Sequence, residues 1–477
     1  MEILPDWNSF LDLRKANSRL PLIAQRKVRN LDPFLLFSEL FAGDVGTFLL
    51  ESGKGPESTA RFSFLGESNG NFLRLDENSI CSFDSILQKI NFDFGENNIP
   101  YAPHFWGGWV GFFSYETICF LEPVDLKKNN TDSIPDLFLA ETGTLLVYDH
   151  QLEILKVILT LKTDTACFQS YSSTIDAMNT LWQRIEKVLE DCPTPKLNSK
   201  NPVISSNSPQ TDSSQWEYCD SVHKAKKYIE DGDIYQANLA QRFEKPYDGK
   251  PSDLYQNLKM VNPSPFGGLF YFPEGALVSS SPERLVKVEN GKIETRPIAG
   301  TRPRGASHKE DGLLSQELLL NEKERAEHLM LVDLERNDLG RICEYGTVEV
   351  TELMNREQYS HVHHIVSNVQ GKLKQGTNLK DILTAVFPGG TITGCPKIRC
   401  MEIIEELEPV RRGIYCGSMG YIGYGPHLDL NILIRTILLK DGVASFHAGA
   451  GIVADSDPDT EYKESLSKAA ALVQALT

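Results

Sequence analysis

Two pairs of glutamates with the same spacing are the residues whose types and positions most clearly suggest chemistry. Glu324 and Glu327 lie in a predicted helix over 310–341, and Glu461 and Glu464 begin another near the end of the chain. Residues three apart on a helix share one face, where two carboxylates repel each other unless a cation lies between them. Carboxylate oxygens suit a hard cation such as Mg²⁺. The pairs predict a magnesium site, although surface helices also carry glutamates at this spacing.

A Gly-rich segment and a lone arginine offer groups that bind anions. The segment AGAGIVADS places Gly449, Ala450 and Gly451 after a predicted strand, where little side chain shields the backbone N–H groups. Arg435 stands in a predicted strand among apolar residues. A buried arginine requires a partner, which is either a ligand carboxylate or an acidic side chain of the protein.

Two further features extend this pattern. The loop PGGTITGCPK leads into a helix N-terminus, which favours anions, although ordinary turns share this composition. Lys468 lies one turn after Glu464, so it either faces the same ligand or forms a plain salt bridge. Taken together, these groups describe a pocket for a small polycarboxylate held by magnesium, backbone amides and an arginine. They do not name a reaction.

The elements that position these residues indicate an α+β protein of 477 residues. Strand patterns and helix patterns occur in groups, which favours a sandwich of antiparallel sheets with helices outside. Residues 191–215 are rich in Pro, Ser and Asn and are the predicted linker. They separate an N-terminal region, 1–190, from a catalytic region, 216–477.

Composition argues against several classes of protein. The formal net charge is -17 and no basic stripe offsets it, so a nucleic-acid binder is disfavoured. The nine cysteines are scattered without a CxxC pair, which argues against a disulfide framework or a zinc site. The N-terminus lacks a signal pattern, and no apolar run approaches ~18 residues. We therefore expect a cytoplasmic protein that does not bind membranes.

Longer motifs resemble those of the chorismate-utilising enzymes, the family of anthranilate synthase component I, aminodeoxychorismate synthase component I, and isochorismate and salicylate synthases. The matching segments begin at about residue 216 and are IYQANLAQRF, SPERLV, RPIAGTRPRG, EKERAEHLMLVDLERNDLGR, SHVHHIVS, GCPKIRCMEIIEELEP, YCGSMGY and AGAGIVADS. The resemblance implies a chorismate-binding fold like that of anthranilate synthase component I, a two-layer antiparallel β-sandwich wrapped by helices. It places the active site in the C-terminal part.

The same resemblance implies roles for individual residues. Glu283 in SPER matches the acid that protonates the leaving 4-hydroxyl group of chorismate, and His364 in HHIVS matches the active-site histidine. Mg²⁺ would join the four glutamates to the ring carboxylate and act as a Lewis acid. The residues assigned to binding chorismate are Thr391, Tyr415, Arg435, Gly449, Ala450, Gly451 and Lys468.

Two positions bear on the nucleophile. Gln236 stands where the water-using members carry a lysine, and an amide cannot take a proton from water, so ammonia is favoured. Because the chain shows no glutaminase module, ammonia would come from a separate glutamine amidotransferase subunit in a heterodimer. Ala299, in PIAGT, stands where aminodeoxychorismate synthases typically have a lysine that adds to ring carbon 2, and it cannot form that adduct.

The resemblance leaves two products. QANLAQRF, TITGCPK, MEIIEELEPVRRGIYCGSMGY and LDLNILIRT look like the aminodeoxychorismate branch, so 4-amino-4-deoxychorismate, on the route to 4-aminobenzoate and folate, is the first choice. Ala299 favours the alternative, anthranilate and pyruvate for tryptophan biosynthesis. FLLES and NPSPF resemble a regulatory tryptophan pocket, although apolar core is the simpler interpretation of Leu49 and Leu50. The residues of this predicted pocket are Leu50, Glu51, Ser52, Asn262, Pro263 and Ser264.

Overall fold

The computed structural model describes residues 2–52, 60–76, 79, 81–90, 92, 99–128, 130, 132–164, 166–191, 209–305, 307–358 and 362–477. Most of the predicted linker, residues 192–208, lies outside the described residues. Within the described part of the chain, no helix is both long and apolar enough to cross a membrane.

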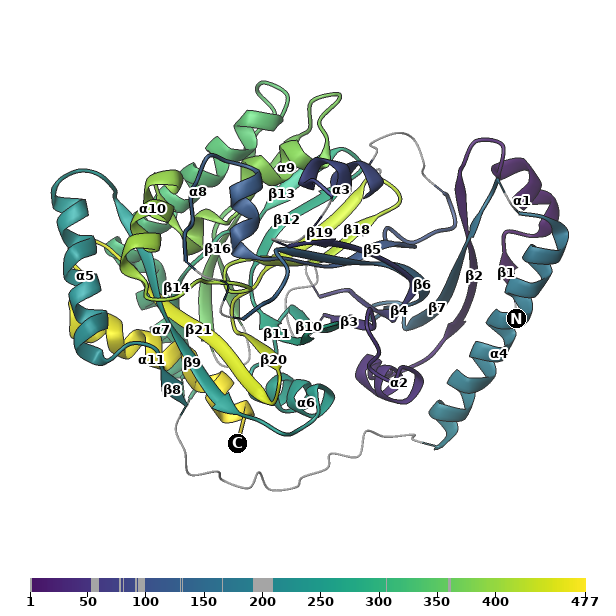
Figure 1. Ribbon diagram of the computed structural model, residues 1–477, viewed down its shortest axis with the longest axis horizontal. Coiled ribbons are helices and arrows are strands. Elements are labelled where there is room, and N and C mark those ends of the chain that lie inside the picture. The colour runs from purple at the N-terminus through teal and green to yellow at the C-terminus, as the bar shows by residue number, and fades with distance from the viewer. Residues whose placement is uncertain are drawn as a thin grey trace.

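Helices and antiparallel strands alternate in groups along the chain, as Figure 1 shows. The strands are β1 (Ile3–Leu4), β2 (Arg19–Lys27), β3 (Phe48–Glu51), β4 (Phe62–Leu75), β5 (Gly108–Phe113), β6 (Leu137–Asp149), β7 (Ile154–Lys162), β8 (Gln210–Thr211), β9 (Gln236–Pro246), β10 (Phe266–Phe272), β11 (Gly275–Ser281), β12 (Arg284–Glu289), β13 (Lys292–Thr295), β14 (Ile298–Pro303), β15 (Glu349–Gln358), β16 (Val362–Lys372), β17 (Gly394–Cys395), β18 (Ser418–Gly423), β19 (His427–Ile432), β20 (Thr436–Lys440) and β21 (Val443–Ile452). The helices are α1 (Trp7–Leu13), α2 (Pro33–Leu40), α3 (Phe83–Ile90), α4 (Phe168–Asp191), α5 (Gln215–Glu230), α6 (Pro251–Val261), α7 (His308–Leu320), α8 (Glu322–Ile342), α9 (Leu379–Val386), α10 (Lys397–Leu407) and α11 (Pro458–Ala475), with short 3₁₀ turns η1 (Tyr115–Phe120) and η2 (Gly390–Ile392). The predicted α+β class is confirmed.

Strands from the two ends of the sequence pair with one another. β3 pairs with β10, and β5 pairs with β18, so two strands from the first quarter of the chain extend the sheet of the C-terminal part. β9 and β21, separated by about 200 residues, pair along ten registered positions from Val443↔Pro246 to Ile452↔Ala237. The N-terminal region is therefore hydrogen-bonded into the same network as the rest. The division of the chain into an N-terminal region, 1–190, and a catalytic region, 216–477, stays a prediction.

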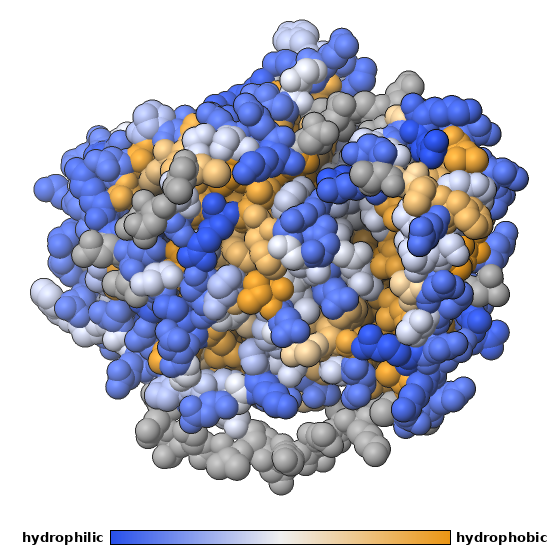
Figure 2. Space-filling view, turned by 45° about the vertical axis from the view of Figure 1, so that its right-hand side comes forward, coloured by the Kyte–Doolittle hydropathy of each residue, from blue (hydrophilic) through white to orange (hydrophobic). Residues whose placement is uncertain are grey.

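Helices cover the two ends of this network. In Figure 1, α4 lies along β2 and β7 at one end, and α5 and α11 lie beside β9 and β21 at the other. Phe48, Phe112 and Phe270 are completely buried in the larger apolar core, and Ile293, Ile382 and Met401 are buried in a second one. The face in Figure 2 is mostly hydrophilic, with apolar side chains gathered in its hollow central part.

Three local predictions were wrong. The single helix predicted over 310–341 is two helices, α7 and α8, because the Asn321 side chain accepts a hydrogen bond from the Glu324 N–H and starts a new helix. Arg435 does not lie in a strand; it lies between β19 and β20 with a φ of 50°, a conformation that interrupts the sheet. Gly449, Ala450 and Gly451 do not follow a strand but form part of β21.

Candidate active site

A cavity of about 910 Å³ brings the predicted residues together. Its walls come from β9, the residues between β11 and β12, β14, α8, β16, η2, β21 and α11, so that most of the C-terminal part contributes to it. Of the predicted catalytic, substrate and metal residues, all except Ala450 line it. Ala450 is wholly buried because neighbouring residues of a strand face opposite sides, and Gly449 and Gly451 occupy the cavity side.

Glu283 lies in the wall of the cavity, between β11 and β12. Its carboxyl group is buried, and this burial raises its pKa to about 7. The nearby Thr391 hydroxyl, the Ile298 N–H and the positive charges of Arg435 and Lys468 favour the ionised form and limit the rise. The Ile298 nitrogen lies 3.4 Å from Glu283 Oε1. A carboxyl group that keeps its proton close to neutral pH has the properties of a general acid.

The residue next to Glu283 fixes its backbone. Arg284 is buried, and its guanidinium makes two parallel hydrogen bonds to Asp429, Nε to Oδ1 at 2.9 Å and Nη2 to Oδ2 at 3.0 Å. Arg284 Nη1 also donates to Glu294 Oε1 at 2.9 Å. The Ile432 N–H donates to the Glu283 carbonyl at 3.0 Å. The strand that begins at Arg284 is therefore held on both sides, which orients the Glu283 side chain.

His364 reaches the cavity from β16 and is neutral at physiological pH. Burial lowers its pKa to about 4, with a further contribution from the positive charge of Arg435. His364 Nδ1 lies 3.1 Å from the Gly300 carbonyl oxygen, which can only accept, so Nδ1 carries the proton and Nε2 does not. The adjacent His363 faces away and lies 2.9 Å from Asp311 Oδ1. In this state His364 can accept a hydrogen bond but does not supply positive charge.

Four carboxylates enter the cavity from two helices. Glu324 and Glu327 lie on α8, and Glu461 and Glu464 lie on α11. Arg302 Nη1 donates to Glu324 Oε1 at 3.0 Å, and Lys468 Nζ lies 2.9 Å from Glu464 Oε1.

Two glycines allow these groups to approach the backbone. Gly300 has a φ of 66°, and a Cβ there would lie 2.9 Å from Glu324 Oε2. A Cβ at Gly451 would lie 2.5 Å from Gln236 Nε2. Gln236 Nε2 in turn donates to Glu327 Oε1 at 3.1 Å. Ala299 also lines the cavity, where it presents only a methyl group.

Two positively charged side chains, Arg435 and Lys468, also line the cavity. Arg435 Nη1 lies 3.4 Å from Asn262 Oδ1, and the Arg435 carbonyl accepts from the Ser280 N–H at 3.1 Å. Lys468 lies on α11 within the same lining. Tyr415 is buried and stacks on His447 with ring centroids 5.2 Å apart, and burial raises the Tyr415 pKa well above its usual value. Arginine, lysine and a protonated phenol are suited to hold carboxylates.

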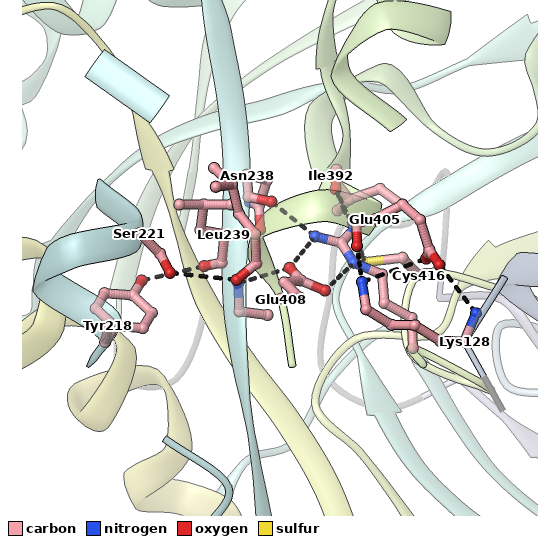
Figure 3. Close-up of polar contacts among 12 residues, drawn as sticks. Lys128, Tyr218, Ser221, Asn238, Leu239, Ile392, Glu405, Glu408 and Cys416 are labelled. Carbon is pink, nitrogen blue, oxygen red and sulfur yellow. Dashed lines mark hydrogen bonds and ion pairs between the residues drawn. The ribbon is translucent and has the colours of Figure 1, made fainter. Parts of the chain in front are cut away.

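A buried ion pair that the sequence motifs do not reveal lies behind the cavity wall. Arg412 and Glu408 are both buried, with Nε to Oε2 at 2.9 Å and Nη2 to Oε1 at 2.6 Å. Arg412 also donates to two backbone carbonyls, Asn238 at 2.7 Å and Ile392 at 3.0 Å. Figure 3 shows Asn238, Ile392, Glu408 and Cys416 converging on this guanidinium. Nothing in the segment LEPVRRG signals burial, because glutamate and arginine are usually exposed.

The predicted tryptophan pocket lies beside the catalytic cavity. A separate cavity of about 410 Å³ is lined by Glu51, Ser52, Pro263 and Ser264, and Leu50 lines a neighbouring one. Asn262 lines the catalytic cavity instead. Glu51 is buried and already matched, since Lys259 Nζ lies 2.7 Å and the Tyr255 hydroxyl 2.8 Å from its carboxylate. Leu49 is fully buried in the apolar core.

Proteins that are similar in sequence belong to the family that the sequence motifs suggest. Residues 48–474 match the sequence profile of a family described as chorismate binding enzyme. The chain belongs to this family. Anthranilate synthase component 1 of Aquifex aeolicus is 40% identical over 98% of this chain and 97% of its own length. Aminodeoxychorismate synthase component 1 of Bacillus subtilis is 44% identical over 78% of both chains.

The fold of the family is shared as well. The crystal structure of anthranilate synthase component I from Streptococcus pneumoniae superposes with a TM-score of 0.76 and 32% identity, covering 94% of this chain and 99% of that one. The predicted membership and fold are therefore confirmed, and the protein is a chorismate-utilising enzyme. Its relatives carry both names that the sequence motifs suggested, so similarity alone does not choose between the two products.

The buried ion pair gives a testable prediction for stability. Arg412→Met should destabilise the protein by about 3–5 kcal/mol, because it leaves the Glu408 carboxylate buried without its partner. The double variant Arg412→Met/Glu408→Leu should recover part of this loss, since it removes both charges. Urea unfolding of the parent and the two variants measures the difference. An unchanged unfolding midpoint in Arg412→Met would show that the pair does not hold this region together.

Proposed function

We propose that this enzyme aminates chorismate with ammonia in the cavity of its C-terminal part. The observation that carries the proposal is that a glutamine, Gln236, stands where the resemblance puts the water-activating lysine of the family. Its side-chain N–H donates a hydrogen bond to Glu327 in the cavity. An amide cannot remove a proton from water. Ammonia needs no such base, because its lone pair is available to attack directly.

Glu283 is the proposed general acid. As the new C–N bond forms, the bond between the ring and its 4-hydroxyl group breaks, and the Glu283 proton leaves with the oxygen as water. The attached nitrogen then loses one proton, which restores the acid. Burial holds the Glu283 pKa at about 7, so the carboxyl group carries this proton over the lower part of the physiological range. His364, neutral and fixed by Gly300, orients the substrate through its Nε2 acceptor.

Chorismate has two carboxylates, and the cavity offers a place for each. Arg435, Lys468, Tyr415 and the backbone of Gly449 and Gly451 lie where charge and hydrogen bonds can bind carboxylate groups. The resemblance to the family assigns the remaining side, lined by glutamates, to the ring carboxylate through a magnesium ion.

The four glutamates fit magnesium held jointly with the substrate. Within the described residues, no group of three or more His, Cys, Asp or Glu side chains is arranged as a complete metal site. Mg²⁺ is commonly bound by one or two carboxylates together with waters and substrate oxygens, which a cavity lined by Glu327, Glu461 and Glu464 can provide. When bound there, the ion would supply Lewis acidity to the ring carboxylate.

The first proposed product is 4-amino-4-deoxychorismate. Four segments resemble the aminodeoxychorismate branch, and each contributes to the catalytic cavity through residues Gln236 and Asn238, Thr391 and Ile392, Tyr415, and Ile434 and Arg435. The likeness is thus concentrated where the substrate would bind. The aminodeoxychorismate synthase component of Bacillus subtilis is among the relatives, so this product lies within the range of the family. Because Ala299 cannot form an adduct, ammonia must attack without a covalent intermediate.

Anthranilate is the second candidate, and the position of Ala299 favours it. The alanine methyl group lines the cavity, so the structure offers no lysine there to occupy ring carbon 2. If ammonia itself adds at carbon 2, loss of pyruvate then yields anthranilate. The relative from Aquifex aeolicus, which aligns over nearly the whole chain, is an anthranilate synthase component.

Two further proposals concern a partner and a regulator. The relatives from Aquifex aeolicus and Bacillus subtilis are both named component 1, and we propose that a separate glutamine amidotransferase supplies ammonia to this chain. We also propose, from the motifs FLLES and NPSPF, that the cavity at Glu51, Ser52, Pro263 and Ser264 is a regulatory tryptophan pocket.

Product analysis tests the proposed function. Purified protein incubated with chorismate, Mg²⁺ and ammonium should consume chorismate and form 4-amino-4-deoxychorismate, identified by mass and by conversion to 4-aminobenzoate with an added lyase. Fluorescent anthranilate formed without a lyase would establish the second candidate in its place. If chorismate is not consumed even at high ammonium, both fail.

The pKa of Glu283 predicts the pH dependence of turnover. Because Glu283 must be protonated to act as the acid, kcat should fall as the pH rises through about 7. Glu283→Gln should lower kcat by at least about 100-fold, within the usual range for general acid catalysis, with little change in the KM for chorismate. The variant should also lose the fall in kcat near pH 7. A loss confined to KM would contradict the assigned role.

A further inference from the structure

A smaller cavity, which the proposed function does not use, lies where β2 begins and β7 ends. It has a volume of about 380 Å³ and shares no described lining residue with the catalytic cavity or with the two cavities near Glu51. Its described lining also includes the last turn of α3, β5 with the residues before it, and the turn after β18. A cavity of this size can hold a small ligand.

Three basic side chains from three separate elements line this cavity. Arg19 is the first residue of β2, Lys162 is the last residue of β7, and Lys89 lies in the last turn of α3. Asp164 is the only acidic side chain in the described lining. A local excess of positive charge, in a chain with a net charge of -17, favours the binding of an anion at this place.

Two of these cations lie directly opposite one another. In the antiparallel pairing of β2 with β7, Arg19 is the partner of Lys162, so their side chains emerge on the same face of the sheet. Like charges in this position destabilise a sheet unless an anion lies between them. Lys162 is exposed and forms no ion pair with a described residue. Lys89 Nζ lies 3.9 Å from Cys81 Sγ, a contact too weak to neutralise its charge.

Arg19 is held in place by Glu141, which does not itself line the cavity. Arg19 Nη1 lies 2.8 Å from Glu141 Oε1, and the guanidinium carbon lies 4.4 Å from the centre of the Tyr424 ring. The Tyr424 hydroxyl donates to the same carboxylate at 2.8 Å, and the side-chain amides of Asn69 and Asn71 donate to it at 2.9 and 2.7 Å. Because this carboxylate serves four donors, it fixes the guanidinium but does not neutralise the two lysines as well.

Aromatic side chains form another part of the wall. Trp106 lies just before β5 and Trp109 lies within it, and each exposes a small part of its ring, 5% and 6% of the side chain. Trp106 packs on Tyr424 with ring centroids 5.4 Å apart. Gly107, with a φ of 150°, permits this packing, because a Cβ there would lie 2.9 Å from the Tyr424 ring. Such a wall suits a planar ring in the ligand.

We propose that this cavity binds a small aromatic anion, a planar ring that carries a carboxylate or a phosphate group. The three basic side chains hold the anionic group, and the aromatic wall contacts the ring. The site does not depend on the amination of chorismate, because none of its described lining residues lines the catalytic cavity.

Isothermal titration calorimetry of the whole chain tests the chemistry of the ligand. Benzoate and phenyl phosphate represent the two anionic groups. Cyclohexanecarboxylate and inorganic phosphate carry the same charges without a planar ring, and benzamide carries the ring without a charge. At least one of the two aromatic anions should bind with a Kd about five-fold or more below those of its non-aromatic counterpart and of benzamide.

Lys162→Glu tests whether the probe binds in this cavity. The variant replaces attraction by repulsion and should weaken binding of the aromatic anion by about ten-fold or more. Because it also gives Arg19 an oppositely charged neighbour, the Tm of the ligand-free variant should not fall below that of the parent. If the Tm does fall, Lys89→Glu, which lies on a separate element, decides: it must weaken binding to a similar extent, and an unchanged Kd would overturn the site.

Lys27→Glu is the matched control. Lys27 is exposed at the other end of β2 and does not line the cavity, so this variant makes the same change in net charge and should bind the probe as the parent does. The site is overturned if neither aromatic anion binds more tightly than its counterparts, or if Lys162→Glu binds like Lys27→Glu. A failure to consume chorismate with ammonium would overturn the amination and leave these binding results unchanged.

Discussion

One buried guanidinium joins the walls of the catalytic cavity. Arg412 binds Glu408 and at the same time donates hydrogen bonds to the carbonyls of Asn238 on β9 and Ile392 in η2, so it holds two walls of the cavity. Glu408 in turn accepts from the Ala240 N–H at 2.9 Å, which adds a second link to β9. A buried ion pair rarely stabilises a fold more than apolar residues would, because both charges lose their hydration. The pair acts through geometry, because it holds the backbone of Asn238 and Ile392 in fixed positions in the cavity wall.

The cavity contains charges of both signs although the chain as a whole is acidic. The chain carries a net charge of -17, yet Arg435, Lys468 and Arg302 line the cavity together with the glutamates. Near the glutamates a carboxylate can bind only together with a cation, whereas Arg435 can bind a carboxylate directly. The Glu283 carboxyl group is buried in the cavity wall near Arg435 and Lys468. Its burial raises the pKa by more than these positive charges lower it. Its proton is therefore retained by desolvation alone.

Most residues that line the cavity could be predicted from the sequence, whereas the buried residues that hold the wall in place could not. The paired glutamates, Arg435 and the Gly-rich segment were found because their residue types are costly or unusual where they stand, and the structure brings them to one cavity. Local geometry was predicted less well: Arg435 leaves the sheet with a positive φ, and the Asn321 cap, a local signal three residues before Glu324, was overlooked and splits the predicted helix. Ala450 was included by adjacency, although strand alternation turns it inward. Asn238 and Arg412 went unnoticed because only burial distinguishes them from ordinary polar residues.

The central claim is that chorismate lies in this cavity with its ring between Glu283 and the amides of β9. A crystal structure of the Glu283→Gln variant with chorismate and Mg²⁺ tests it most directly, because the variant should bind the substrate without consuming it. The account predicts the ring carboxylate beside a magnesium ion held by glutamates of α8 and α11, and the other carboxylate near Arg435 and Lys468. Chorismate bound elsewhere, with these glutamates remote from any ligand, would contradict it.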